Sequence, residues 1–429
     1  MASKQIKEII KRILEKIKLS KDEEKEIYTK VERFIKKLNE KLKKEGIKAD
    51  VFLGGSFAKK TLIRKKEYDV DIFLRFDKKT KEEEINKIIE RLKEIDNFTG
   101  EIVKGSRNYL RFRQESENLI FELVPVIKIK KPQEARNVTD LSYFHVNYIE
   151  NCIKSELKLS NEIKVAKAFI FASGCYGAES YIKGFSGYAI ELLVCYYKSF
   201  LNFIKKISES KEKIIIDPAK FYKNKKEILL NLNEAKLSSP IVLIDPTFKE
   251  RNALAALSNE TFKKFQNYCK DFIKNPDEEF FQTKKIDENE LRKLAEREKM
   301  IFVKIKAVTN KQEGDIAGSK LLKFYNYLIK EFKRYCEIYK NGFEYSGGSY
   351  AFYYFILKAM PEITIRGPPL TDKENVEKFR AKHKETFIQY NRIYAKEIVD
   401  FNVNKFFSNF QIKNKSVMLD MGITKLSLE

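Results

Sequence analysis

Two aspartates separated by a single residue, Asp69 and Asp71, constrain this chain more than any other feature. They lie in the alternating run Tyr68 to Phe76, the pattern of a β-strand with one buried face. Side chains at positions i and i+2 leave a strand on the same face, about 6.6 Å apart along it, so the two carboxylates converge. Neighbouring anions repel, and a fold tolerates them where divalent cations bind between them. Mg²⁺ prefers such oxygen ligands.

A glycine turn precedes this strand. The tripeptide Gly54-Gly55-Ser56 follows a short predicted strand, Ala49 to Leu53, and twelve residues separate it from Asp69. Glycines permit a tight turn and a close approach of the backbone to a phosphate, while Ser56 can offer its amide and hydroxyl at the start of a helix. Cationic side chains follow the turn, among them Lys59, Lys60, Arg64 and Lys65. The turn therefore predicts an anion cradle.

A third carboxylate, Glu122, lies in the predicted strand Leu119 to Ile129, which can pair beside the strand of the aspartates. Three acidic ligands, two Mg²⁺ ions and an anion cradle are what in-line displacement at a nucleoside triphosphate requires. Each part alone has a plainer explanation, since alternating aspartates occur on solvated strand edges, Gly-Gly-Ser occurs in ordinary turns, and Glu122 fits a surface position. The joint spacing favours the catalytic interpretation. No G-x-x-x-x-G-K-[ST] or G-x-G-x-x-G motif is present.

The chain is strongly basic, with a net charge of +23. This surplus predicts a polyanionic partner such as nucleic acid, with a membrane surface as the weaker alternative. Part of the lysine excess also fits the compositional bias of a thermophile or an AT-rich genome. Charge alone therefore does not identify the partner.

The composition argues against several classes of protein. Five cysteines without a C-x-x-C pair predict neither a disulfide framework nor a cysteine zinc site, and two histidines argue against histidine-rich metal ligation. The longest apolar stretch, Ala189 to Tyr197, is interrupted by Glu191 and falls short of the ~20 residues that span a bilayer. Lys4 to Leu19 has the spacing of an amphipathic helix rather than of a signal peptide. We expect a soluble, cytoplasmic protein without a membrane partner.

The hydrophobic pattern predicts three domains, at residues 1–146, 147–274 and 275–429. The first carries two helices, the second of them opened by the reciprocal cap Ser20 and Glu23, followed by the three strands and a helix at 81–95. The second is mostly helical. The third has predicted strands at 301–308 and 350–358 and predicted helices at 319–339 and 371–394. The predicted fold class is α+β multidomain, with a mixed-sheet head, a helical central domain and a mixed α/β tail.

Together these motifs resemble the polymerase β-like nucleotidyltransferase superfamily, and more closely the archaeal (class I) CCA-adding enzymes, the tRNA nucleotidyltransferases. The resemblance covers nearly the whole chain. Beyond Gly55-Ser56 and Asp69/Asp71, the similar segments are Asp140 to His145, Lys167 to Glu179, Lys183 to Leu193, Ile244 to Asn252, Arg366 to Pro368 and Glu374 to Val376. The head motifs alone indicate a nucleotidyltransferase, and the middle motifs narrow the resemblance to this family.

The resemblance implies template-independent addition of C, C and A to the 3′ end of tRNA from CTP and ATP, with two Mg²⁺ ions and release of pyrophosphate. It implies that the metal-binding catalytic residues are Asp69, Asp71 and Glu122. It implies nucleotide-binding roles for Gly55, Ser56, Lys59, His145, Lys167, Tyr176 and Arg251, of which the arginine helps to choose the incoming base. It further implies a homodimer, with the tRNA acceptor end at the head and the tRNA elbow on the C-terminal domain.

Three positions depart from the family pattern. Glu122 stands where aspartate is usual and is one methylene longer. Lys59 replaces the more common arginine, which loses bidentate phosphate geometry but keeps the charge. Arg107 stands where a histidine is more usual. None of these changes removes a part of the implied mechanism.

Without the family resemblance, several of these residues can also be explained by a structural role instead of nucleotide binding. Lys167 and Tyr176 can face one site only if their helix ends near Gly174; otherwise they fit a snorkelling lysine and a buried tyrosine. His145 fits a surface histidine equally well. Arg251 fits either a surface ion pair or a rigid fork that reads a base.

We expect the C-terminal domain to recognise RNA by its shape and charge rather than by its base sequence. Basic residues recur on its first predicted helix: Lys320, Lys323, Lys330, Lys333 and Arg334. The aromatic residues of the run Tyr350 to Phe355 are expected to fill the core rather than to stack on bases. Two alternatives to CCA addition stay open, a poly(A)-type or other terminal RNA nucleotidyltransferase and a non-catalytic RNA-binding protein.

Overall fold

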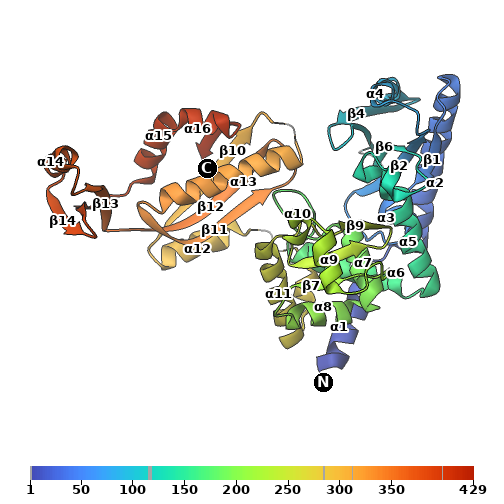
Figure 1. Ribbon diagram of the computed structural model, residues 1–429, viewed down its shortest axis with the longest axis horizontal. Helices are drawn as coiled ribbons and strands as arrows, with labels where there is room; N and C mark the ends of the chain where they lie inside the picture. The colour runs from blue at the N-terminus through green and yellow to red at the C-terminus, as the bar shows by residue number, and fades with distance from the viewer. Residues whose placement is uncertain (1, 115–117, 284–285, 312, 399) are drawn as a thin grey trace. The chain divides into compact units, whose positions relative to one another are not determined.

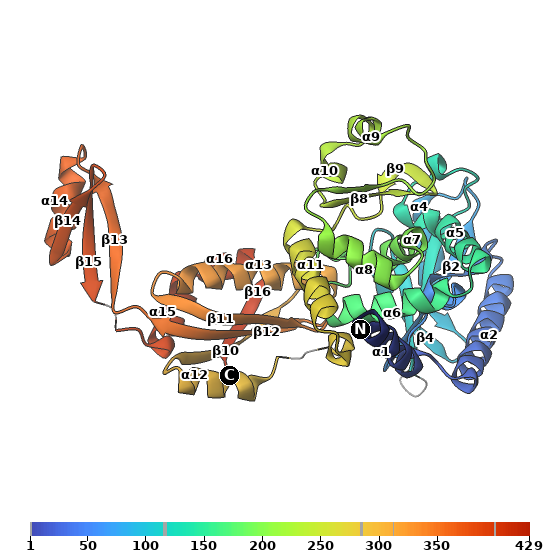
Figure 2. The ribbon, with the colours of Figure 1, turned by 90° about the horizontal axis from the view of Figure 1, so that it is seen from below.

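The computed structural model describes residues 2–114, 118–283, 286–311, 313–398 and 400–429 (Figures 1 and 2). The chain forms two compact units, Met1–Thr283 and Lys284–Glu429. The finer division at residues 146/147 and 274/275 stays a prediction. Among the described residues no helix is both long and apolar enough to cross a membrane.

The head of the first unit is built on a six-stranded mixed sheet with the strand order β1-β2-β6-β5-β4-β3. Its strands are β1 (Asp50–Leu53), β2 (Tyr68–Phe76), β3 (Glu94–Ile95), β4 (Phe98–Val103), β5 (Tyr109–Gln114) and β6 (Leu119–Ile127). The pair β2 and β6 is parallel, and the other neighbours are antiparallel. The three predicted strands are confirmed, whereas β3, β4 and β5 were not foreseen. The helix predicted at 81–95 was too long, because it ends at Arg91 and Glu94–Ile95 form β3.

Two helices bury one face of this sheet: α2 (Lys21–Lys44) and α4 (Glu82–Arg91). The predicted cap of α2 is confirmed, because the Ser20 hydroxyl accepts from the Glu23 amide and the Glu23 carboxylate accepts from the Ser20 amide. Phe34 of α2 is fully buried and stacks on Phe121 of β6 at 4.3 Å between ring centroids. The opposite face of the sheet carries the side chains of Asp69, Asp71 and Glu122.

A helical region completes the first unit. Its helices are α1 (Ala2–Ile17), α5 (Ser142–Ser155), α6 (Leu159–Ala172), α7 (Gly187–Tyr197), α8 (Phe200–Glu209), α9 (Lys225–Asn231), α10 (Glu234–Leu237) and α11 (Asn259–Lys274). Ile6, Ile9 and Ile13 of α1 are buried in this helical core although the helix is first in the sequence. Helix α1 lies beside α6 (Figure 2). A small sheet of β7 (Ile214–Ile216), β8 (Ile241–Asp245) and β9 (Phe248–Asn252) interrupts the helices. The mostly helical prediction missed these strands.

The second unit contains an antiparallel four-stranded sheet of order β11-β12-β10-β16 and a three-stranded sheet of order β13-β15-β14. Its strands are β10 (Ile301–Thr309), β11 (Cys336–Tyr345), β12 (Tyr350–Ala359), β13 (Glu362–Pro369), β14 (Glu385–Gln389), β15 (Arg392–Ile398) and β16 (Ile423–Leu428). Its helices are α12 (Glu288–Arg297), α13 (Asp315–Phe332), α14 (Lys373–Lys382), α15 (Val403–Lys413) and α16 (Lys415–Asp420). Helix α13 packs across the larger sheet (Figure 1).

Two helix predictions in this unit were too long. The helix predicted to reach Tyr339 ends at Phe332, and residues 336–339 belong to β11. The helix predicted over 371–394 is α14 followed by the hairpin of β14 and β15. Both extensions were wrong because backbone pairing with another strand outweighs local helical spacing. The predicted aromatic core is confirmed for Tyr353, Tyr354 and Phe355, which are at most 4% exposed. The prediction was wrong for Tyr350, which is 40% exposed at the first position of β12.

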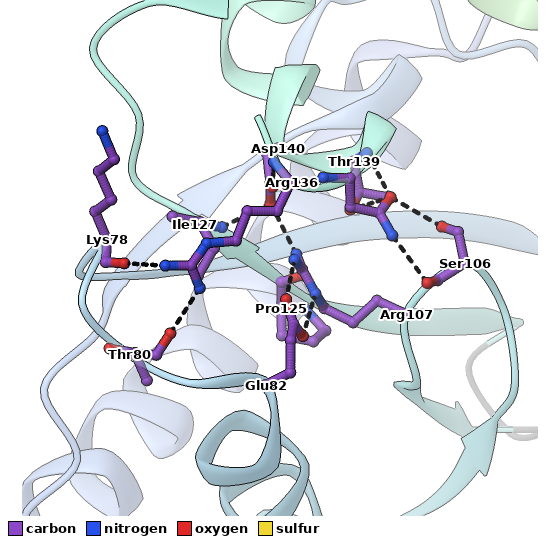
Figure 3. A network of polar contacts seen from close by, with 11 residues as sticks. Lys78, Thr80, Glu82, Ser106, Arg107, Pro125, Ile127, Arg136, Thr139 and Asp140 are labelled. Atoms are coloured by element: carbon purple, nitrogen blue, oxygen red, sulfur yellow. Dashed lines mark hydrogen bonds and ion pairs between the residues drawn. The ribbon is translucent and has the colours of Figure 1, made fainter. Parts of the chain in front are cut away.

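Figure 3 shows a polar network that joins the sheet to the segment leading into α5. Asp140 Oδ1 accepts from Arg107 Nη1 and from the Ile127 amide, both at 2.7 Å. Its other oxygen accepts from the backbone amides of Arg136 and Asn137 at 3.0 Å. Arg107, the departure from the usual histidine, is 8% exposed and therefore acts here as a buried structural cation.

We expect Asp140→Ala to lower the free energy of unfolding by about 3–5 kcal/mol, because it leaves a buried guanidinium and three amides without their shared acceptor. Urea unfolding followed by circular dichroism measures the change. Glu90→Ala is the matched control, since Glu90 pairs with Lys93 on the surface and its loss is expected to cost at most about 1 kcal/mol. Equal losses in the two variants would contradict the role given to this network.

Candidate active site

The predicted carboxylates share the open face of the head sheet. The parallel register of β2 and β6 places Asp71 directly beside Glu122. Val70 and Ile72, the neighbours of Asp71, are fully buried on the opposite face. Asp69 is exposed, whereas Asp71 and Glu122 are partly buried. The alternation of β2 therefore separates a core face from a carboxylate face, as the pattern predicted.

The glycine turn closes directly over Asp71. Gly54 donates its amide to the Asp71 carbonyl at 2.9 Å, which ties the turn to the strand of the aspartates. Gly55 has a φ of +61°, and a Cβ at this position would lie 1.7 Å from Asp71 Oδ2. Only glycine leaves the carboxylate where it is. Ser56 follows in the one-turn helix α3 (Gly55–Ala58), whose C-cap is Lys59.

The three carboxylates at this face are compensated unequally, because Asp69 and Glu122 each have an ion-pair partner whereas the described ion pairs include none for Asp71. Burial, and next the Glu122 carboxylate, raise the pKa of Asp71 to about 7, although Lys59 acts in the opposite direction. Lys65 Nζ lies 3.7 Å from Asp69 Oδ2. The hard oxygens of the Asp71 carboxylate border the space that a Cβ on Gly55 would fill, and they fit Mg²⁺.

Glu122 differs from the two aspartates because it already has a cationic partner. Arg111 of β5 donates to Glu122 Oε1 from Nε at 3.1 Å and from Nη2 at 2.9 Å. Within the described ranges, no three His, Cys, Asp or Glu side chains are grouped as they would be around a metal ion. Asp69 and Asp71 therefore fit Mg²⁺ directly, whereas Glu122 would need its second oxygen or release from Arg111. The metal role of the three residues stays a prediction.

The two predicted phosphate lysines meet at a buried glutamate that was not predicted. Glu191 of α7 accepts from Lys59 Nζ at 2.5 Å, from Lys167 Nζ at 2.7 Å and from the Thr61 hydroxyl at 2.9 Å. Burial acts to raise the pKa of Glu191, but the ammonium groups of Lys167 and Lys59 outweigh it and bring the pKa to about 2. Burial also lowers the pKa of Lys167 to about 8.

Tyr176 is turned back toward the same region by the end of α6. Gly174 has a φ of +66°, and the Cys175 amide donates to the Ile170 carbonyl, so the helix stops as its glycine predicted. Burial, and then the carboxylates of Glu191, Glu179, Asp71 and Asp69, raise the pKa of Tyr176. The tyrosine therefore lies within the electric field of the carboxylate face.

His145 and Arg251 converge on a second acidic residue, Asp245 of β8. Arg251 Nη1 donates to Asp245 Oδ2 at 2.5 Å, and His145 Nε2 lies 3.1 Å from the same oxygen. Tyr188 donates its hydroxyl to Asp245 Oδ1 at 3.0 Å, and its ring stacks on His145 at 4.0 Å between centroids. Burial lowers the pKa of His145 although Asp245 opposes it. His145 is thus mostly buried rather than a surface histidine.

Sequence reasoning did not assign roles to four residues that organise this region: Thr61, Tyr188, Glu191 and Asp245. One of them left a signal, because Glu191 is the charged residue that interrupts the apolar run Ala189 to Tyr197. A charge inside an otherwise apolar helix predicts a buried, paired group. The partners of that group lie more than twenty positions away and could not be named from the spacing.

The head sheet with its paired aspartates has the fold of the polymerase β-like nucleotidyltransferases. Two solved structures share this fold, one described as a cytoplasmic RNA terminal U-transferase and one as the Cid1 poly(U) polymerase with Mg 3′-dATP bound. Each has a TM-score of 0.52 over 66% of this chain, with 100% and 99% of the other chain covered and sequence identities of 12% and 13%. This likeness concerns the fold alone.

Family descriptions match most of the first unit. "Second Messenger Oligonucleotide or Dinucleotide Synthetase domain" matches residues 5–143, and "tRNA nucleotidyltransferase, second domain" matches residues 161–282.

Curated relatives extend the similarity into the second unit. The CCA-adding enzyme of Nanoarchaeum equitans is 35% identical over 372 residues, which cover 85% of this chain and 86% of that protein. The CCA-adding enzyme of Methanocaldococcus jannaschii is 29% identical over 405 residues, covering 91% and 87%. The chain belongs to the family of CCA-adding enzymes.

Proposed function

We propose that this chain adds C, C and A to the 3′ end of tRNA without a nucleic-acid template, using CTP and ATP and releasing pyrophosphate. The observation that carries the proposal is the pair Asp69 and Asp71 on one open strand face, closed over by a glycine turn that has two lysines behind it. This arrangement places anionic metal ligands next to a cationic cradle, as a nucleotidyl transfer requires.

The reaction forms one bond and breaks one. The 3′-hydroxyl oxygen of tRNA forms a bond to the α-phosphorus of the nucleotide and gives up its proton to water, and the bond from the α-phosphorus to the bridging oxygen breaks, so that pyrophosphate leaves. Two Mg²⁺ ions bound by Asp69, Asp71 and Glu122 would activate the hydroxyl and stabilise the leaving pyrophosphate. The glycine turn keeps Asp71 in place, and the amide and hydroxyl of Ser56 hold the triphosphate together with Lys59.

The remaining assigned residues bind the rest of the nucleotide. Lys167 contributes a second cation to the triphosphate, while His145 and Tyr176 contact phosphate and ribose. Arg251 presents a planar fork of donors to the edge of the incoming base. Asp245 holds that fork at 2.5 Å and therefore limits where the arginine can reach. Base choice follows from this restricted position.

The tRNA is the natural partner of the basic surface. We propose that the head takes the acceptor end and that the second unit takes the elbow, through lysines of α13 such as Lys320, Lys323 and Lys330. Lys333 and Arg334 follow the end of that helix rather than lying on it. A cytoplasmic homodimer completes the proposal.

The test is the identity of the nucleotides added to tRNA trimmed of its 3′ end. With Mg²⁺ and CTP alone, we expect growth by C and C; with CTP and ATP, we expect growth to stop after a single A. Gel electrophoresis of end-labelled tRNA resolves each step. Continued growth of an A tail would instead indicate a poly(A)-type enzyme. If none of the nucleotides gave pyrophosphate release, the result would indicate a non-catalytic RNA-binding protein.

A further inference from the structure

Glu191 is a fully buried carboxylate on the otherwise apolar helix α7, and three side chains from two parts of the fold converge on it. Lys59 and Thr61 come from the segment that follows the glycine turn, and Lys167 comes from α6. Lys167 also donates to the Thr61 hydroxyl at 2.9 Å. All four residues are at most 8% exposed. The Thr61 amide bonds to the Ser56 carbonyl at 2.9 Å, so the contacts reach the turn itself.

A contribution to folding stability does not by itself explain why Glu191, Lys59 and Lys167 are buried together. Taking charges out of water costs more than their attraction usually returns, and packed apolar side chains of similar volume are commonly as stable. The group also contains two ammonium ions and one carboxylate, so an excess of one positive charge stays buried. That excess lies directly behind the glycine turn, since Lys59 is the C-cap of α3.

We propose that Glu191 is a positioning residue for the nucleotide triphosphate: it holds Lys59 and Lys167 side by side before the nucleotide arrives, so that their excess charge meets the phosphates. This proposal rests on the triphosphate roles given to the two lysines above. Two free ammonium groups would repel and separate, because nothing else in the described contacts bridges them. A carboxylate between them fixes their spacing and removes the ordering cost from the binding step.

A plain structural tie between the turn and the helices is the competing explanation. The two explanations predict a different pH dependence of CTP affinity, because a positioning role requires Glu191 to keep Lys167 charged. The charged groups that face Lys167 are Glu191 from α7 and Lys59 and Lys65 from the head. With Glu191 present, the pKa of Lys167 is about 8, so affinity for a triphosphate should fall as the pH rises through that value. Without the carboxylate, this fall should move to lower pH.

The experiment measures CTP binding to the full-length protein by calorimetry in the absence of RNA, between about pH 6 and about pH 9. Glu191→Gln is expected to weaken CTP binding by roughly tenfold to a hundredfold, as is typical for residues that orient binding groups, and to lower the pH at which affinity is lost. Glu191→Asp keeps the charge and is expected to retain the pH midpoint of the unmodified chain while binding with intermediate affinity.

Glu331→Gln is the matched control, because Glu331 is 7% exposed and pairs with Arg334 in the second unit. It is expected to change the melting temperature without changing CTP affinity or its pH midpoint. Each variant is first shown to be folded by circular dichroism, and the KM for CTP is then compared with that for tRNA. If Glu191 positions the lysines, its replacement should raise the KM for CTP and leave the KM for tRNA unchanged.

Unchanged CTP affinity and an unchanged pH midpoint in folded Glu191→Gln would overturn the proposal and leave a structural tie. If Glu191→Gln does not fold, the same two readouts in Glu191→Asp decide, since a shorter carboxylate must weaken CTP binding if spacing matters. Failure of the unmodified chain to bind CTP would instead overturn the proposed function, so the two failures are distinguishable.

Discussion

Asp71→Asn is expected to reduce nucleotide addition to trimmed tRNA by more than about a thousandfold. Asparagine has nearly the same shape, so the turn that bonds to the Asp71 backbone can stay in place. It lacks the negative charge that a hard divalent cation needs, and a neutral amide oxygen is a weaker ligand. The loss should therefore appear in the chemical step while tRNA binding is retained.

The measurement is single-turnover incorporation of labelled CTP, with tRNA affinity determined separately by filter binding. The melting temperature in metal-free buffer is expected not to fall, because the change removes a like charge from beside Glu122. Asp50→Asn is the matched control, since Asp50 lies on the neighbouring strand β1 and pairs with Lys128 on the surface. Turnover near the normal rate in Asp71→Asn would refute the metal-ligand assignment.

Gly55→Ala is expected to lower turnover by about a hundredfold or more, because a misplacement of about one ångström at a reacting group has an effect of this size. The added Cβ would lie 1.7 Å from Asp71 Oδ2, so either the carboxylate rotates or the turn moves. Alanine also disfavours the φ of +61° that Gly55 adopts. Both effects act on the carboxylate face itself.

Gly46→Ala separates the two effects. Gly46 has nearly the same backbone conformation, with a φ of +64°, but nothing lies within 4 Å of an added Cβ. It should lower the free energy of unfolding by about 1–2 kcal/mol and leave turnover unchanged. Equal turnover in the Gly55 and Gly46 variants would show that the close approach to Asp71 does not matter for catalysis.

Much of the head followed from local pattern. The alternation in Tyr68 to Phe76 predicted β2 with its observed ends, because side chains on a strand must alternate between two faces. The cap of α2 and the helix end at Gly174 were also readable, since each depends on atoms only a few positions apart. These are the features that short-range geometry controls.

The second unit shows where local pattern fails. Residues 336–339 continue the helical spacing of α13, yet they lie in β11 because that strand pairs with β12 along its length. The hairpin of β14 and β15 replaces a predicted helix because β15 pairs both with β14 and with the separate strand β13. Strand pairing needs a second segment, and the free energy that it contributes is absent from the hydrophobic pattern of either segment alone.

The sequence by itself determined the chemistry that is present: paired aspartates in one strand, a glycine turn before them and cations behind. Only the tertiary structure decided which groups those residues meet, placing Glu191 between Lys59 and Lys167, Arg111 against Glu122, and Asp245 between His145 and Arg251. The physical reason is distance along the chain. A strand or a turn sets geometry over a few residues, whereas a buried charge takes its partner from whichever distant element packs against it.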